Sequence, residues 1–197
     1  MMSMRPLRLS WNALILANAI IFTPDLTFAG MSVEEVRQFR DYLTKAEKGE
    51  RRAQEMVALH YEIGTGTPSD FSEAARWFHK AAEQGSVVSQ FSLGTYYING
   101  KGVIKDPEKA VYWFRKAAMS GNASAQIKLG ECLESGIGVE KDLIEAYAFY
   151  NLASITNQDG PKRRDGLRGK LSKAQVESAQ RRSITLQQEI KTKQAGK

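Results

Sequence analysis

The sequence predicts an all-α protein, a right-handed solenoid of antiparallel helix pairs with a half-repeat before the pairs and capping helices after them. Three observations predict this fold. Glycines recur every 36 residues, at Gly49, Gly85 and Gly121, and a regular period of this length is typical of repeat proteins. Each period contains two stretches whose apolar residues recur at helical spacing. A Gly-x-Gly separates the two stretches, as expected where the chain turns from one helix to the next.

The period divides most of the chain into three units, residues 49–84, 85–120 and 121–156. The same residue types occupy the same positions in each unit. The matching positions include Gln54, Gln90 and Gln126; Val57, Leu93 and Leu129; Gly64, Gly100 and Gly136; Asp70, Asp106 and Asp142; and Trp77, Trp113 and Phe149. Because a single helix pair cannot bury its apolar face alone, we expect the three units to stack on one another.

The second unit shows most clearly why each unit folds as two helices. Leu93 and Tyr97 continue an apolar stripe at a spacing of four, and Gly100 ends that helix because glycine readily adopts the left-handed conformation. Asp106 is expected to cap the next helix, and Pro107 suits its first turn, where a backbone N–H has no helical partner. A phosphate-binding glycine loop would instead follow a strand. We therefore interpret the Gly-x-Gly as a corner between helices.

Helices are also predicted on either side of the three units. Residues 30–48 are expected to form an N-terminal capping helix, with Ser32 and Glu35 as a capping box. Residues 157–197 are expected to form C-terminal capping helices and a basic tail, with another capping box that begins at Ser172. A narrow apolar stripe follows, which we expect to cover the exposed end of the solenoid. Its residues are Val176, Ala179, Ser183, Leu186 and Ile190.

The first 29 residues have the order of a secretory signal peptide. Arg5 and Arg8 precede a short apolar run, residues 11–22, and the small residue Ala29 stands before an expected cleavage point at Gly30. The run has about 12 residues, fewer than the roughly 20 that span a bilayer. We therefore predict that residues 1–29 are removed, that the mature chain has no transmembrane segment, and that the protein is periplasmic or secreted. A buried core helix and an uncleaved anchor are the alternatives.

The charge of the chain is unevenly distributed. The formal net charge is +6, and residues 157–197 carry eleven Lys and Arg against four Asp and Glu. Residues 30–156 are close to neutral. A solvated capping helix accounts for this basic end, and contact with anionic lipids, cell-wall polymers or an acidic partner is the alternative. Nucleic acid is not an expected partner of an exported protein.

The sequence shows no arrangement of residues typical of catalysis, metal binding or cofactor binding. Cys132 is the single cysteine, which excludes an intrachain disulfide and a cysteine-rich zinc site, and we expect it to be buried. We expect His60, which lies beside the buried tyrosines, to be a partly buried structural residue, and His79, which lies outside the apolar stripe, to be exposed. Neither has a second ligand at zinc spacing. The acidic residues are scattered, and no pair stands out as acid and base. We therefore predict a protein that is not an enzyme, with no cofactor and no metal.

The stretch "SQFSLGTYYINGKGVIKDPEKAVYWFRKAAMSGNASAQ" resembles a Sel1-like repeat, a relative of the tetratricopeptide repeat. The resemblance covers residues 49–156 in three consecutive copies. The first copy has Ala58 where the family favours glycine, and the third has Leu133 and Phe149 in the aromatic positions. The resemblance implies a scaffold or regulator of protein complexes, whose first helices line the concave side of the solenoid and hold a protein or peptide partner there.

If the first helices line a groove, the stripe opposite their core face is the expected protein-binding site. Its residues are Leu59, Val88, Phe91, Thr95, Ile98, Ile127 and Glu131. Exposed apolar side chains at Phe91 and Ile98 would mark a binding surface, because contiguous exposed apolar surface often does so. Acidic side chains edge this strip in the first and third copies, which favours a partner segment with basic flanks. The alternative is that Phe91 packs on the adjacent repeat.

Two other functions are weighed against the scaffold. One is an envelope-surface protein that contacts anionic polymers or lipids through the basic C-terminal helices. The other is an enzyme that acts on cell-wall peptides or binds β-lactams. The resemblance implies the enzyme only weakly, because the cysteine-rich relatives linked to β-lactam binding have disulfides within their repeats, and this chain has one cysteine.

Overall fold

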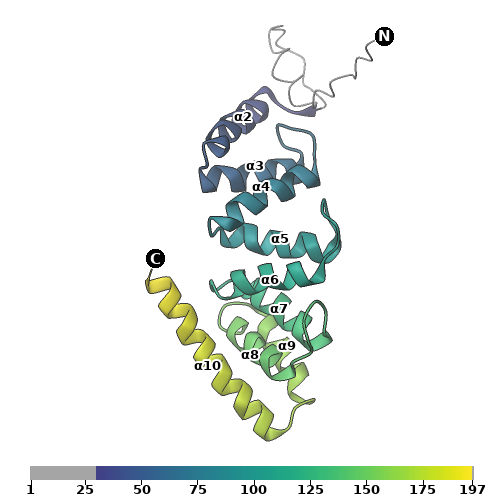
Figure 1. The fold of residues 1–197 in the computed structure, drawn as a ribbon, viewed down its shortest axis with the longest axis vertical. Helices are drawn as coiled ribbons and strands as arrows, with labels where there is room; N and C mark the ends of the chain where they lie inside the picture. Colours follow the sequence, from purple (N-terminus) through teal and green to yellow (C-terminus); the bar gives the residue numbers. More distant parts are fainter. Residues whose placement is uncertain (1–29, 197) are drawn as a thin grey trace, which may run out of the picture.

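The structure, a computed structural model, describes residues 30–196, and this part of the chain forms nine α-helices and no strand (Figure 1). The helices are α2 (Val33–Glu47), α3 (Arg51–Ile63), α4 (Phe71–Glu83), α5 (Val87–Asn99), α6 (Pro107–Ala118), α7 (Ala123–Ser135), α8 (Leu143–Ala153), α9 (Asp159–Arg168) and α10 (Lys173–Ala195). The proposed signal peptide, residues 1–29, lies outside the described residues. None of the helices between residues 30 and 196 is both long enough and apolar enough to cross a membrane.

The helices form the predicted solenoid. Helices α3 and α4, α5 and α6, and α7 and α8 pack as pairs, and the second helix of each pair packs on the first helix of the next. Helix α2 packs on α3 as the second helix of a preceding half-repeat, and α9 packs on α8 in the place of a fourth first helix. Figure 1 shows the helices piled along the long axis of the molecule. The all-α solenoid is therefore confirmed.

The helix boundaries follow the caps expected from the sequence. The side chains of Asp70, Asp106 and Asp142 accept hydrogen bonds from backbone N–H groups in the first turns of α4, α6 and α8. The capping boxes at Ser32 and Ser172 are both present, each with its reciprocal side chain three residues later. These interactions satisfy N–H groups that have no partner inside the helix.

The second glycine of each Gly-x-Gly allows the backbones of successive repeats to come into close contact. Gly66, Gly102 and Gly138 have φ values of 69°, 66° and 67°, which L side chains rarely adopt. They also lie against the first turn of the previous unit's second helix: a Cβ at Gly102 would stand 2.1 Å from the Phe71 carbonyl oxygen. The corner predicted from the sequence is therefore also a contact between repeats.

The recurrence of the glutamines every 36 residues has a structural reason as well. The Nε2 atoms of Gln54, Gln90 and Gln126 donate to backbone carbonyls eight residues earlier, at distances of 3.2, 3.1 and 3.2 Å. Those carbonyls belong to Ala46, Ala82 and Ala118, in the last turns of α2, α4 and α6. Carbonyls at a helix C-terminus lack helical partners, so each glutamine attaches its helix to the end of the one before it.

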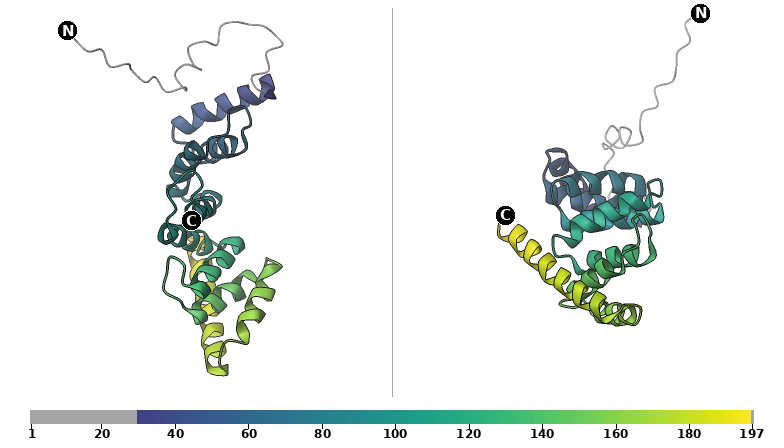
Figure 2. Two further views of the ribbon diagram at one scale, coloured as in Figure 1. Left: turned by 90° about the vertical axis from the view of Figure 1, so that its right-hand side faces the viewer. Right: turned by 60° about the horizontal axis from the view of Figure 1, so that its bottom comes forward.

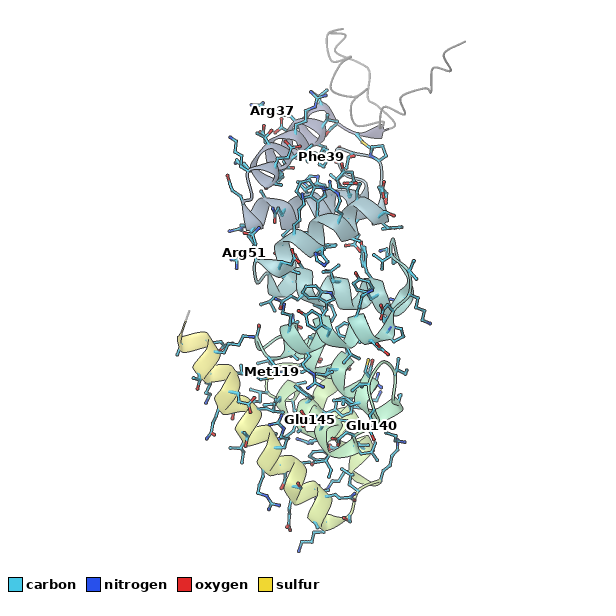
Figure 3. All side chains as sticks on the ribbon, viewed as in Figure 1. Arg37, Phe39, Arg51, Met119, Glu140 and Glu145 are labelled. Atoms are coloured by element: carbon cyan, nitrogen blue, oxygen red, sulfur yellow. The ribbon has the colours of Figure 1, made fainter. Side chains whose placement is uncertain are left out.

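The core consists of two hydrophobic clusters that meet in the second repeat. Leu93 and Trp113 belong to the N-terminal cluster, and Phe114 belongs to the C-terminal one. Gly94 lets α6 approach closely, because a Cβ there would stand 2.4 Å from the Phe114 ring. At the N-terminal end, Phe39 lies between α2 and α3 with its ring 5.3 Å from that of Tyr61 (Figure 3).

Helix α10 does not extend the stack. Its predicted apolar stripe is buried against α8, and its C-terminal part reaches the turn between α6 and α7, where the Gln194 side chain donates to the Ser120 carbonyl at 3.2 Å. The two views in Figure 2 show α10 running back along the side of the array. The predicted C-terminal capping helices are therefore present: α9 continues the stack on α8, and the stripe of α10 covers another side of α8.

Candidate functional site

The predicted binding stripe is partly exposed, and most of its exposed apolar surface lies on α5. Val88 is 48% exposed. Phe91, Thr95 and Ile98 on α5 are half-buried, as are Leu59 on α3 and Glu131 on α7. Ile127 on α7 is only 7% exposed and belongs to the core. We therefore expect the α5 residues, together with Leu59, to supply any apolar contact with a ligand.

Phe91 has a structural role in addition to any role in binding. Its ring centroid lies 5.9 Å from that of Phe114, at an interplanar angle of 46°, so the ring packs on the second helix of its own repeat. The backbone carbonyl of Phe91 accepts a hydrogen bond from the Thr95 hydroxyl at 3.2 Å. Removing the Phe91 side chain would therefore disturb the core as well as the surface, whereas Val88 and Thr95 can be changed with less effect on packing.

Three of the carboxylates that edge the stripe already form ion pairs within the protein. Glu131 lies 2.7 Å from Arg163 and 2.9 Å from Lys128, and Glu134 lies 2.7 Å from Lys170. On the other side of α5, Glu62 pairs with Lys101 at 3.0 Å. Because these charges are neutralised internally, the acidic edge is less available to a partner with basic flanks than the sequence alone indicated.

Glu134 is held as a carboxylate by its neighbours. Burial raises the pKa of this group, but hydrogen bonds from Lys170 and from the Tyr150 hydroxyl outweigh burial and lower it below its ordinary value. Burial, together with its hydrogen bond to Glu134, raises the pKa of Tyr150. The two cations, Arg163 and Lys170, were not recognised in the sequence as site residues. They lie after the last of the three units, residues 121–156, so the repeat pattern gave no signal for them.

The histidines and the cysteine occupy structural positions. His60 is buried, and its Nδ1 atom lies 2.6 Å from the Thr65 carbonyl oxygen. His79 is half-buried rather than fully exposed, because its ring packs edge-on against Trp113 at 5.5 Å. Cys132 is buried, and burial, with the nearby Glu131, raises the pKa of its thiol. Across residues 30–196, no three His, Cys, Asp or Glu side chains are grouped so that they could hold a metal ion.

Comparisons with known proteins identify the repeats. A family model described as Sel1 repeat matches residues 51–86, 87–122 and 123–154. A protective antigen present in uropathogenic Escherichia coli strains and displaying an SLR fold is 32% identical, with a TM-score of 0.72; the match covers 84% of this chain and 36% of that one. A Sel1 repeat protein from Oxalobacter formigenes is 36% identical, with a TM-score of 0.61 over 66% of this chain and 98% of that one.

A further similarity extends to the fold alone. Cysteine rich protein B of Helicobacter pylori is 22% identical, with a TM-score of 0.52 over 64% of this chain and 95% of that one. None of the curated proteins compared with this chain matches it. The three matched repeats make up more than half of the chain, and their helix pairs stack as described above. The chain belongs to the Sel1 repeat family.

Proposed function

We propose that this protein is an exported scaffold that binds a partner protein or peptide along the first helices of its repeats. Sel1 repeats commonly act as protein-interaction scaffolds, and their all-helical fold is typical of non-enzymatic repeat proteins. The observation that carries the proposal is the partly exposed apolar stripe on α5, with Val88 at its most exposed point. The binding surface comprises Leu59, Val88, Phe91, Thr95 and Ile98, with Glu131 at its edge.

A partner must first be identified, by cross-linking in intact cells followed by mass spectrometry. The variant Val88→Glu with Thr95→Glu then places two charges on the stripe and leaves Phe91 on Phe114. We expect recovery of the partner to fall at least tenfold, because buried unpaired charges are costly at an interface. Helicity and the melting temperature should change little.

A matched control variant is available on α10. Ile184 is 57% exposed, and the neighbouring Thr185 hydroxyl donates to the carbonyl four residues earlier, at 3.3 Å, as Thr95 does on α5. Ile184→Glu with Thr185→Glu should retain the partner. Equal recovery with both double variants would show that the partner binds elsewhere.

Export is supported by the order of basic, apolar and small residues in residues 1–29. The intact mass of the mature protein should correspond to a chain that starts at Gly30 or within a few residues of it. Recovery of the full-length chain from the cytoplasm would contradict both the localisation and the class of partner.

The envelope-surface alternative has less support. Three of the cations that make the C-terminal segment basic, Arg163, Lys170 and Arg182, are paired with Glu131, Glu134 and Glu145 of the third repeat. These pairs favour a role in capping the array over a role in binding an anionic surface. Among residues 30–196, no observation favours an enzyme that acts on cell-wall peptides or β-lactams.

A further inference from the structure

Helix α10 shows how another helix can pack on α8, the second helix of the third repeat. Arg182 on α10 contacts Glu145 on α8 with N–O distances of 2.8 and 3.2 Å, and Asn151 donates to the Ser183 hydroxyl at 2.9 Å. Glu145 is labelled in Figure 3. Ala148 lies on the same stripe of α8, between Glu145 and Asn151 by helical periodicity, and is fully buried. A helix with an apolar stripe and complementary charge therefore covers this face of the third repeat.

The equivalent face of the first two repeats is open. The positions that correspond to Ala148 are Arg76 on α4 and Tyr112 on α6; Arg76 is exposed, and Tyr112 is 53% exposed. The positions that correspond to Leu152, which is buried on α8, are Lys80, which is exposed, and Lys116, which is half-buried. We name this surface on α4 and α6 the outer face; its stripe residues are Glu73, Arg76, His79, Lys80, Lys109, Tyr112, Arg115 and Lys116.

The outer face is positively charged where the covered face of α8 is negative. Its stripe carries five cations and one carboxylate, whereas the α8 stripe carries the Glu145 carboxylate and no cation. Several of these cations have partners: Arg76 pairs with Glu73, Lys109 with Asp106, and Arg115 lies 3.9 Å from Glu145.

Lys80 and Lys116 have no carboxylate within 4.0 Å among residues 30–196. The Lys80 ammonium lies 4.1 Å from the centre of the Trp77 ring, and that of Lys116 lies 4.8 Å from the centre of the Trp113 ring. Stacking on an indole holds each ammonium at the surface without neutralising it. Because the two lysines are one repeat apart, the outer face offers regularly spaced positive charges.

A hollow of about 390 Å³ lies beside these charges, between α4 and α6. Its walls include Tyr97, Tyr112 and Trp113, and its one carboxylate, Glu83, lies 3.5 Å from His79. Aromatic walls of this kind take an apolar side chain. The outer face therefore combines an aromatic hollow with cations, which are the features that complement an amphipathic helix bearing carboxylates.

We propose that the outer face of α4 and α6 docks an acidic amphipathic helix of a partner protein, in the manner in which α10 docks on α8. Helix α10 runs along one side of the array (Figure 1) and ends beside Ser120, at the turn after α6. The partner helix would therefore lie beyond the end of α10, over α6 and α4. Its carboxylates meet Lys80 and Lys116, and its apolar stripe covers the aromatic hollow. This surface is separate from the α5 stripe.

The probe is a synthetic 23-residue peptide with the α10 sequence and five substitutions. These are Lys173→Glu, Arg181→Glu, Arg182→Glu, Lys191→Glu and Lys193→Glu. The peptide keeps the apolar stripe of α10 and reverses its charge. Binding of the labelled peptide to the full chain is measured by fluorescence anisotropy. A peptide of native α10 sequence and a scrambled peptide with the composition of the acidic one are the comparisons.

We expect the acidic peptide to bind at least tenfold more tightly than either comparison peptide. Lys80→Glu with Lys116→Glu should weaken this binding at least tenfold, because like charges then face each other across the interface. Lys45→Glu with Lys48→Glu, at exposed positions in the last turn of α2 and directly after it, makes the same change in net charge and should leave the affinity within twofold. Melting curves confirm that both variants are folded.

Three results would overturn the proposal. One is the absence of binding by the acidic peptide, and another is unchanged affinity in the Lys80 and Lys116 variant. The third is equal binding of the scrambled peptide, which would show general attraction of acidic polymers to a basic surface. The variant with Val88→Glu and Thr95→Glu should bind the acidic peptide like the wild-type protein, so failure at the outer face is distinguishable from failure of the α5 stripe.

Discussion

The second and third repeats have the same fold but different surroundings. Both consist of two helices of similar length, with leucine, glycine and aromatic residues at equivalent core positions. In the third repeat, α9 and α10 pack on the pair, and Ala148 is 0% exposed, whereas the equivalent Tyr112 of the second repeat is 53% exposed. The repeat pattern therefore determines how a helix pair folds, while the helices packed around the pair determine which of its faces remain available to a partner.

The second and third repeats also differ in the charges on these faces. The third repeat carries Glu131, Glu134 and Glu145 on faces that the C-terminal segment covers with cations. The second repeat has Thr95, Ile98 and Lys109 at the equivalent positions. The charge of the C-terminal segment is therefore complementary to that of the third repeat, which it covers. This explains why a strongly basic segment follows a nearly neutral repeat array.

The largest effect is expected from removing α10. A chain that stops after Leu171 loses the buried side chains Val176, Leu186 and Ile190, each of which contributes about 1.5–3 kcal/mol, so we expect a destabilisation of roughly 5 kcal/mol. Hydrogen exchange should accelerate in α7 and α8 far more than in α3. A chain that stops after Thr192 keeps the whole stripe and serves as the control.

Unchanged protection of α8 in the chain that stops after Leu171 would contradict this prediction. It would mean that the third repeat does not depend on α10 for its stability, and that the two repeats do not differ in the way described above.

An intermediate loss of stability is expected from truncating the leucine that the second and third repeats share in their cores. Leu93 and Leu129 are 1% and 0% exposed and occupy the same place in the second and third repeats. Leu93→Ala and Leu129→Ala should each cost about 2–5 kcal/mol, from lost transfer energy and the cavity left behind. Thermal unfolding measures both. If Leu93→Ala leaves the melting curve unmoved, the repeat register is wrong; a clear difference between the two variants would show that the cover also stiffens the core.

The smallest effect is expected at Glu134, whose equivalent in the second repeat is the non-titrating Ile98. Because its pKa is lowered in the folded state, Glu134 stabilises the fold above the unfolded-state pKa of about 4.3, and this contribution is lost as the pH falls through the lowered folded value. Glu134→Gln should therefore cost less than about 1 kcal/mol at pH 7 and nothing measurable at pH 2. Urea unfolding at both values tests this, and a difference that persists at low pH would rule out the carboxylate as its source.

Much of the fold was predictable because its signals are local. The aspartate caps, the glycine helix ends and the apolar stripes each depend on residues a few positions apart, and the 36-residue period repeats them along the chain. The helices begin and end where these signals predict. The candidate site was less predictable. Val88 is exposed as the groove model requires, but Ile127 is buried and Phe91 packs on Phe114, because exposure depends on residues far away in the chain.

Local signals were enough to specify the helix pairs and their corners, since backbone capping and helical periodicity act over short distances along the chain. The 36-residue period gave the order in which the pairs stack. Helix packing sets where α10 lies, which cations neutralise Glu131 and Glu134, and why residue 102 must be glycine. These features depend on contacts between segments that are roughly one repeat or more apart. Such contacts are set by how whole helices pack, so no local pattern specifies them.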